Sequence, residues 1–399
     1  MDNEKKIQSI LKTVEGELKV WLQDEPMIKD PIEYEKRLLQ MAHRFGKNVI
    51  QEGSGTHSKD RNAKKKILTL FGKVSLRKSH PICKGTSLFK ISLFLQDAIC
   101  DLAQNSVFEY VSRILFKLLF IQISAKQVQR VSEWYGDQLN SIVKANQIEY
   151  IPQLPEKKDK NEVTYVMPDG SMLNTREEKW KEIKLCRIFR ESDNVAIQAE
   201  RNEIVKSVFV NHFGETNEFW LKVERHLKSY NNLVFIGDGA KWIWKGVEDS
   251  YPGAIQILDY YHAEEKLEIL ARLLFRDSGK KQKWLSEQKE ILFNDGVMQV
   301  IENIKEFKPR NVEAREYKQS VINYYSENED RMMYKTFRNK GLLIGSGPIE
   351  AAHRSVLQQR LKLSGQLWTI KGAQAIANLR CYAAGGSWNI IQNLFRLAA

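Results

Sequence analysis

Three acidic residues stand where folding alone gives little reason to place a carboxylate. Asp169 follows the strand-like stretch "VTYVMP", Asp238 follows the apolar run "LVFIG", and Glu350 lies in the first turn of a helix opened by "GSGP". A charged group at the end of a buried strand must be solvated, paired or bound to a cation. Carboxylates that converge from separate elements hold the two divalent ions of phosphoryl-transfer sites, and Mg²⁺ prefers oxygen ligands. The pattern therefore indicates a two-metal site for phosphodiester chemistry.

Each of these residues also has a purely structural interpretation. Asp169 lies in "PDG", which is typical of a β-turn. Asp238 could cap the next helix, although its neighbours Gly237 and Gly239 would also let a phosphodiester come close to the backbone. Glu350 could serve the N-terminal end of its own helix. Taken one at a time, the three residues leave both interpretations open.

The charge of the whole chain favours a polyanionic partner. Among 399 residues, 62 Lys and Arg stand against 50 Asp and Glu, which gives a formal net charge of +12; such an excess favours nucleic-acid binding. The charged N-terminus and the lack of any run of about 18 apolar residues predict a cytoplasmic protein with no membrane partner. The widely separated cysteines favour reduced thiols over disulfides or a zinc site; they are Cys83, Cys100, Cys186 and Cys381.

The N-terminal part of the sequence has the features of a DNA-binding region. Residues 1–58 have helical periodicity and lead into 59–150, where the span from Lys59 to Lys90 holds ten basic residues and one acidic residue. Within it, "KILTLFGKVSLRKS" alternates like a hairpin. Further on, a helix, a break near "IQIS" and a second helix capped by Ser124 form a helix-turn-helix pattern. The early turns of the second helix carry the predicted DNA contacts Lys126, Gln127, Gln129 and Arg130. An ordinary helical hairpin with a solvated basic surface is the alternative.

After the proline-containing stretch "IPQLPEKKDKNE" the pattern changes to strands and then to strand–helix–strand units. This order predicts an α+β or α/β domain with a mixed sheet. Pro168 cannot donate a ladder hydrogen bond, so we expect its strand to end or lie unpaired there. Residues 263–340 are almost wholly helical and highly charged, and a long helical region follows.

Four stretches of the sequence resemble one known family. They are "MPDGSMLNTREEKWKEIKLCRIF", "IGDGAKWIWKGVEDSYPGAIQILDYYHAEEKL", "IGSGPIEAAHRSVLQQRLKLSGQLWTIKGAQAIANLR" and "GGSWN". Together they are similar to the DDE transposases of bacterial insertion sequences, specifically the Kra-type family of the Mutator-like group. The N-terminal third is less similar: relatives often show cysteine-rich spacing near the basic hairpin, whereas only Cys83 is present here, so zinc binding stays open.

The resemblance implies a ribonuclease-H-like catalytic domain over residues 160–262 plus 341–399, interrupted by an all-α insertion at 263–340. It implies that Asp169, Asp238 and Glu350 bind two Mg²⁺ or Mn²⁺ ions, with Asp259 and His262 of "DYYH" as supporting catalytic residues. Further DNA contacts would come from the helix after Asp238 and from the third stretch, namely Lys241, Trp242, Arg354, Arg360 and Lys362. A tryptophan on such a helix is more often part of the core than a ligand contact.

A transposase would bind the terminal inverted repeats of its element and target DNA, both double-stranded. It would act as a homodimer or higher oligomer in the bacterial cytoplasm, associated with the nucleoid when bound to DNA. Two other functions remain compatible with the sequence. One is a catalytically silent, transposase-derived DNA-binding protein. The other is a ribonuclease-H-like nuclease that cuts without joining.

Overall fold

The computed structural model describes residues 3–25, 28–53, 64–145, 147–154, 161–198, 201–228, 230–309 and 311–397. The chain divides into two compact units. The first contains Met1–Ser141, Ala375–Arg380 and Ser387–Ala399, and the second contains Ile142–Gln374 and Cys381–Gly386. No helix in the described ranges is long and apolar enough to cross a membrane.

The first unit consists of helices around one small hairpin. A pair of helices, α1 (Asn3–Asp24) and α2 (Pro31–Gly53), precedes the hairpin strands β1 (Lys64–Thr69) and β2 (Gly72–Arg77). Inward residues of the hairpin, such as Ile67 and Val74, form a buried cluster, and Gly72 turns the chain with φ 87°. The remaining elements are α3 (Leu93–Asn105), α4 (Phe108–Leu119), α5 (Ala125–Lys144), part of α15 (Ile370–Ala384) and α16 (Trp388–Leu397).

The predicted hairpin and two-helix layout of this unit are confirmed. Helix α4 ends where Phe120 takes a left-handed φ of 50°, and four further residues lead to α5. The hydroxyl of Ser124 accepts a hydrogen bond from the backbone N–H of Gln127 at 3.2 Å, which satisfies one of the free donors at the start of α5. The apolar face of α5 is buried through Val128, Val131 and Tyr135.

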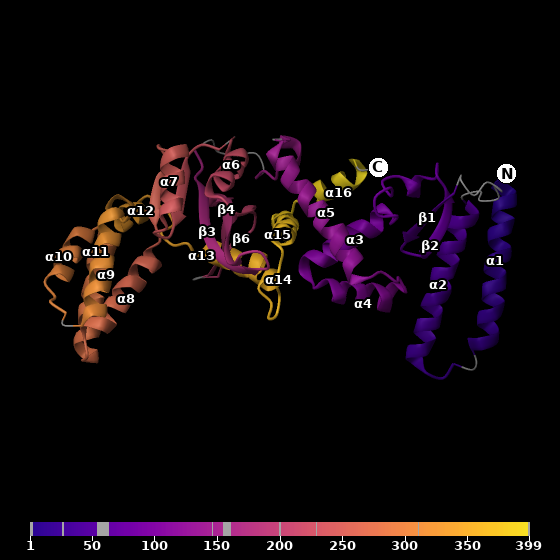
Figure 1. Ribbon diagram of the computed structural model, residues 1–399, viewed down its shortest axis with the longest axis horizontal. Helices are drawn as coiled ribbons and strands as arrows, with labels where there is room; N and C mark the ends of the chain where they lie inside the picture. The colour runs from indigo at the N-terminus through magenta and orange to yellow at the C-terminus, as the bar shows by residue number, and fades with distance from the viewer. Residues whose placement is uncertain are drawn as a thin grey trace. The chain divides into compact units, whose positions relative to one another are not determined.

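The second unit is a mixed α+β domain built on one five-stranded sheet. Its strands are β3 (Thr164–Thr175), β4 (Lys179–Arg190), β7 (Val208–Phe213), β8 (Leu233–Gly237) and β9 (Ile255–Leu258), in the order β7-β4-β3-β8-β9. The long strands β3 and β4 form an antiparallel pair (Figure 1), whereas β8 and β9 run parallel to β3. Helices α6 (Thr216–Leu227) and α7 (Lys241–Ser250) make the crossovers that parallel strands require. This arrangement is compatible with a ribonuclease-H-like fold.

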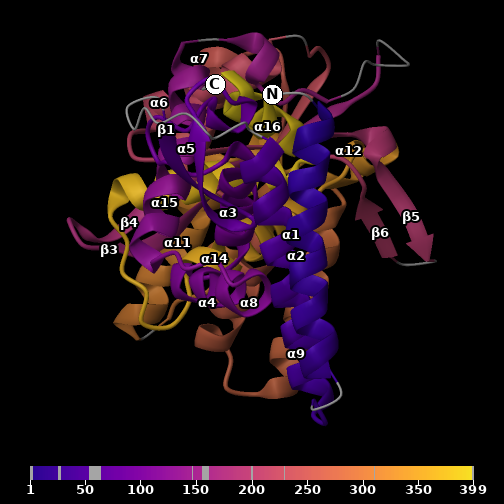
Figure 2. The same ribbon diagram turned by 90° about the vertical axis from the view of Figure 1, so that its right-hand side faces the viewer.

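Two features of the sheet domain lie outside this sheet. Strands β5 (Asn194–Gln198) and β6 (Arg201–Ile204) form a separate antiparallel ribbon, visible in Figure 2. The helical stretch predicted at 263–340 forms α8 (Tyr260–Leu274), α9 (Ser278–Phe293), α10 (Val297–Lys305), α11 (Val312–Glu327) and α12 (Tyr334–Asn339). Helices α8 to α11 pack side by side (Figure 1), and α13 (Gly347–Ala352), a π-helical turn (His353–Gln358) and α14 (Gln359–Leu361) follow.

The strand does not end at Pro168, but the proline does lie beyond the ladder with β8 and is unpaired on that side. Pro168 pairs in register with Cys186 of β4, and β3 continues to Thr175. The parallel ladder with β8 stops earlier, at Val166 and Phe235. The missing N–H of the proline therefore costs little, because the ladder with β8 has ended before Pro168 and the only other described partner of β3 on that side is Trp368, which bridges to Thr175 at its far end. Asp169 consequently lies inside a strand rather than in a β-turn.

The last part of the chain is divided between the units. The sequence placed residues 341–399 with the catalytic domain, whereas Ala375–Arg380 and Ser387–Ala399 cluster with the N-terminal residues. The side-chain amide of Asn378 donates to the carbonyl of Gly136 on α5 at 2.8 Å. Helical periodicity alone gives no information on which unit such a helix joins.

The close approach of α5 to α15 within the first unit leads to a test of packing. A Cβ at Gly136 would overlap the backbone carbonyl of Ala375, which cannot move as a side chain can. We expect Gly136→Ala to lower the free energy of unfolding by about 1–3 kcal/mol through overpacking, measured by urea denaturation. The matched control is Gly16→Ala on α1, where the described residues leave open space; an equal loss in both variants would contradict the packing argument.

Candidate active site

The parallel pairing of β3 with β8 brings Asp169 and Asp238 to the same edge of the sheet. Thr164 pairs with Leu233 and Val166 with Phe235, so partner residues differ by 69 positions, the same separation that divides Asp169 from Asp238. A Cβ built on Gly237 would lie 3.6 Å from the carbonyl of Pro168, so the two strands remain adjacent one residue before the acids.

The surroundings of Asp238 explain one of its glycine neighbours, Gly239, structurally. Its Oδ1 accepts a hydrogen bond from the N–H of Ala240 at 2.9 Å, while Ala240 itself occupies the cap position of α7. A Cβ at Gly239 would overlap the ring of Tyr324 on α11. Glycine is therefore required at 239 because a helix of the 263–340 region packs against this loop.

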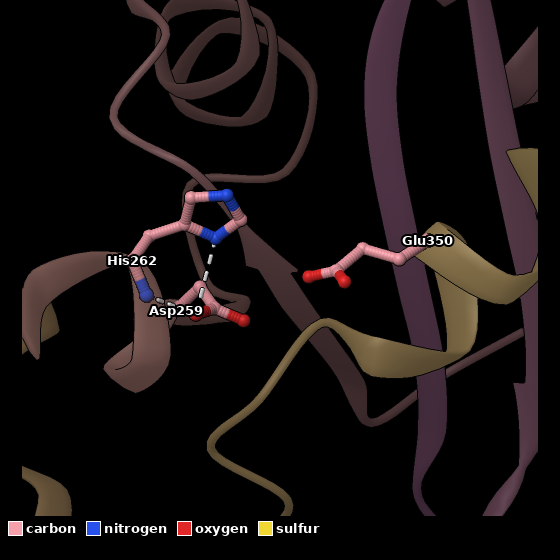
Figure 3. A group of neighbouring side chains, drawn as sticks. All are labelled: Asp259, His262 and Glu350. Atoms are coloured by element: carbon pink, nitrogen blue, oxygen red, sulfur yellow. Dashed lines mark hydrogen bonds and ion pairs between the residues drawn. The ribbon is translucent and has the colours of Figure 1, made fainter. Parts of the chain in front are cut away.

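Glu350 enters the site from α13, as predicted from "GSGP". Pro348 lies at the start of α13 and Glu350 in its first turn. The exposed carboxylate of Glu350 points towards Asp259 and His262 (Figure 3), and ligand atoms of these three residues lie within 4.8 Å of one another. Ser346 precedes the helix, and its Oγ lies 3.5 Å from Glu350 Oε1.

Asp259 is fully buried and connects several segments of the site. Its Oδ1 accepts from the backbone N–H of His262 at 2.6 Å, which caps α8, and its Oδ2 accepts from the N–H of Ser346 just before α13. The N–H of Asp259 donates to the carbonyl of Gly237 at 2.8 Å. Burial by itself would raise the pKa of Asp259, but the hydrogen bonds from His262 and Ser346 outweigh burial and hold that pKa below its ordinary value.

His262 forms an ion pair with Asp259. The Nδ1 atom lies 3.2 Å from Asp259 Oδ1, and about 39% of the imidazole side chain is exposed. The interaction with Asp259, together with the negative charges of Asp238 and Glu350, raises the pKa of His262 to about 9 against the opposing effect of burial. The imidazole is therefore a cation at neutral pH, facing a group of carboxylates.

Asp169 shows that this carboxylate group carries uncompensated negative charge. Burial, with smaller effects of the charges of Asp238 and Glu350, raises the pKa of Asp169 to about 6 against the hydrogen bond from the Gly170 N–H and the charge of His262. In the described part of the chain, no lysine or arginine forms an ion pair with the carboxylates of Asp169, Asp238 or Glu350. A donor set of oxygens with excess negative charge fits a divalent cation such as Mg²⁺.

A second histidine, His353, is absent from the set predicted by the sequence. Its Nε2 lies 3.2 Å from Asp169 Oδ2, and only 3% of the residue is exposed. Burial lowers the pKa of His353 to about 4, so the ring is neutral. His353 begins the π-helical turn after α13, a distortion that is frequent at functional sites. Its spacing of three residues from Glu350 was the only available signal in the sequence.

The predicted DNA contacts of the second unit differ in their surroundings. Lys241 forms an exposed ion pair with Glu327 at 3.4 Å. Trp242 is half-buried, with its ring nearly perpendicular to that of Phe219 and the ammonium of Lys184 5.3 Å from its ring centre.

The DNA contacts predicted after Glu350 differ from one another in exposure and in their partners. Arg354 is exposed, and the Nζ of Lys362 donates to Ser171 Oγ at 2.6 Å close to Asp169. Arg360 is 1% exposed, with its guanidinium carbon 4.9 Å from the centre of the Trp368 ring. A guanidinium packed inside the domain does not reach a phosphate, so Arg360 is left out of the proposed DNA contacts.

The predicted contacts of the first unit lie on the early turns of α5. Lys126 and Arg130 are exposed and Gln127 is half-buried. The side-chain amide of Gln129 donates to Glu133 Oε1 at 2.6 Å. Lys126 and Arg130 thus lie on the side of α5 opposite to its buried apolar face, whereas Gln127 and Gln129 are half-buried on its two flanks.

A family model described as "Uncharacterised protein family (UPF0236)" matches residues 56–392. The chain belongs to this family. None of the curated proteins matches this UPF0236 chain. Among solved structures, the chain is similar to one titled "Drosophila P element transposase strand transfer complex", with 10% identity and a TM-score of 0.34 over 74% of this chain and 92% of that chain. A likeness of this size does not show a shared fold.

The raised pKa of Asp169 predicts how the stability of the metal-free protein depends on pH. The folded-state pKa of about 6 lies above the ordinary value of 3.8, so the folded state binds the proton more tightly than the unfolded state. The contribution of Asp169 to stability is therefore greatest below pH 4 and is lost as the pH rises through 6. The carboxyl group is 33% exposed, so we expect a loss on the order of 1 kcal/mol.

Urea unfolding in the presence of a chelator, at several pH values between 4 and 7, measures this loss. Asp169→Asn cannot ionise, so the difference between the wild type and this variant isolates the titration of Asp169 from that of other acids. Parallel stability curves for the two proteins would contradict the shifted pKa.

Proposed function

We propose that this chain is a DNA transposase that cuts and joins phosphodiester bonds at a metal-dependent site formed by Asp169, Asp238 and Glu350. The proposal is supported by the β3–β8 register, which brings Asp169 and Asp238 to one edge of the five-stranded sheet, and by the negative charges of Asp238 and Glu350, which raise the pKa of Asp169. The ligand atoms that lie within 4.8 Å of one another are those of Asp259, His262 and Glu350, so a shared metal site would also need Asp169 and Asp238 to reach the ions beside this group. The resemblance of the four sequence stretches to DDE transposases names the same residues independently. Oxygen donors with excess negative charge suit two Mg²⁺ or Mn²⁺ ions.

Divalent ions held there would supply activation of the attacking hydroxyl and neutralisation of charge on the phosphate. The protein itself contributes by holding the three carboxylates in fixed positions. Asp169 is fixed within a paired strand, Asp238 is held by the hydrogen bond from Ala240, and Glu350 is carried by a short helix attached to Asp259 through Ser346. In-line attack depends on such positioning, because little covalent chemistry is required of the protein.

The surrounding residues suit a phosphodiester substrate. The exposed ring of His262 is cationic, and Lys362 lies beside Ser171 close to Asp169. Both could contact phosphate oxygens that are not held by a metal ion. In this proposal, Asp259 positions His262 and Glu350, because both of its oxygens already accept backbone hydrogen bonds.

Three features favour a transposase over the two alternatives. The retention of all three acids argues against a catalytically silent DNA-binding protein. The helices of residues 260–339, one of which packs against the Asp238 loop through Tyr324, form a large addition that a compact nuclease would not need. The helix-turn-helix layout in the basic first unit provides a separate site for the element's terminal repeats, and two ends would be joined by a dimer or higher oligomer.

Asp238→Asn tests the catalytic assignment. The variant keeps the hydrogen bond to Ala240 but loses the charge that a cation needs, so Mg²⁺-dependent cleavage should fall about 100-fold or more. The substrate is a plasmid carrying the DNA that flanks this reading frame, and cleavage is followed on gels. Binding to the same DNA, measured by fluorescence anisotropy, should stay near the wild-type value. The control is Asp249→Asn on the exposed side of α7; equal cleavage by Asp238→Asn would remove the metal assignment.

The double variant Lys126→Ala with Arg130→Ala tests the DNA-binding role of α5. Both side chains lie on the exposed face of its early turns, so their removal should weaken duplex binding about ten-fold or more. Lys12→Ala on α1, which removes one exposed charge elsewhere in the unit, is the control. Unaltered binding by the double variant would dismiss the helix-turn-helix interpretation, while the cleavage assay with Asp238→Asn would still test the site.

A further inference from the structure

A basic pocket lies beside the start of α5 in the first unit, formed by the β1–β2 hairpin, the segment 89–91 and residues 122–130. Its volume is about 460 Å³. Its rim carries the cations Lys66, Lys73, Lys90 and Arg130, and its floor includes the apolar side chains of Leu68 and Ile123. None of the residues described as lining it is acidic.

The hairpin register explains why two of these lysines face the pocket. Leu68 pairs directly with Lys73, and Lys66 pairs with Ser75, so these side chains share one face of the hairpin. The opposite face is packed into the buried cluster through Ile67 and Val74. The alternation of the strands therefore divides the hairpin into an apolar inner face and a cationic face.

Lys90 is fixed at the pocket by its backbone. Its φ of 56° is left-handed, which is uncommon for a residue other than glycine. The carbonyl of Lys90 accepts from the Leu68 N–H and its own N–H donates to Thr86, both at 2.9 Å. A strained backbone conformation persists only where the contacts around it enforce it. Such conformations are often found at ligand sites.

Arg130 completes the cationic rim from α5. Its guanidinium lies 5.3 Å from the ring centre of Phe89, which holds it across the pocket. In the described part of the chain no carboxylate forms an ion pair with Lys66, Lys73, Lys90 or Arg130. Four cations around one depression repel each other, and a bound polyanion would relieve that repulsion.

We propose that this basic pocket binds the phosphodiester backbone of the duplex that α5 contacts, so that the hairpin anchors the DNA beside the helix. This inference rests on the proposed function of the chain. The cations lie exposed on the rim, as backbone contacts require, while Leu68 and Ile123 offer an apolar surface to deoxyribose. The pocket fixes the position of the duplex without distinguishing its sequence.

The test is a triple variant, Lys66→Gln with Lys73→Gln and Lys90→Asn. Asparagine is chosen at 90 because it tolerates the left-handed backbone without the charge. The probe is a fluorescent duplex of arbitrary sequence, titrated by anisotropy at several salt concentrations. We expect binding about ten-fold weaker than wild type, with the slope of log affinity against log salt reduced by roughly 1 to 3, because each lost phosphate contact lowers it by about 0.9.

The matched control is Lys78→Gln with Lys84→Gln, two exposed lysines that lie outside the pocket. Thermal unfolding followed by circular dichroism checks that all variants are folded. Wild-type affinity and salt slope in the triple variant, or an equal loss in the control, would overturn the pocket assignment. A loss confined to single-stranded DNA, or displacement of the duplex from the wild type by micromolar pyrophosphate, would overturn it in favour of another phosphate ligand.

These outcomes separate the pocket from the proposed function. If the wild type cleaves plasmid in an Asp238-dependent manner while the triple variant binds normally, the pocket inference alone fails. If the wild type neither binds duplex nor cleaves it, the proposed function fails and the pocket inference fails with it.

Discussion

The buried carboxylate of Asp259 is the interaction on which the candidate site depends. One oxygen caps α8 through the N–H of His262, the other accepts from Ser346 before α13, and the backbone N–H of Asp259 is bound to Gly237 of β8. A charge with no exposed surface is tolerated only when its hydrogen bonds are made. The requirement to satisfy Asp259 therefore ties together three segments that are far apart in the sequence, and with them the residues Asp238, His262 and Glu350.

The second constraint on the candidate site is the register in which the strands of the sheet pair. Parallel pairing of β3 with β8 fixes which residue stands beside which, and a slip of one position would turn Asp169 to the other face. Strand β3 is bonded to β4 along its whole length, so Asp169 is held although the parallel ladder has already ended. Pro168 fits here because the side on which it lacks a donor has no partner strand.

Local structure could be predicted from the sequence, whereas the long-range contacts could not. Alternation and turn residues gave the β1–β2 hairpin, and periodicity with Ser124 gave the start of α5. The pairing of Pro168 with Cys186 and the division of α15 between the units depend on distant segments, which no local pattern encodes. The roles predicted for Asp169, Asp238 and Glu350 remain predictions. His353 was missed because its spacing of three residues from Glu350 does not by itself distinguish it from a structural histidine.

The two histidines of the site have different charges and therefore affect the carboxylates differently. His262 is exposed to the field of Asp238, Asp259 and Glu350 and is charged, whereas His353 is enclosed beside Asp169 and is neutral. The neutral ring of His353 does not compensate the negative charge of Asp169. The cationic ring of His262 offsets part of the negative charge of Asp238, Asp259 and Glu350. The site thus keeps its least compensated charge at Asp169, where a divalent cation would gain most, and holds the positive charge of His262 at a partly exposed position, where a phosphate could contact it.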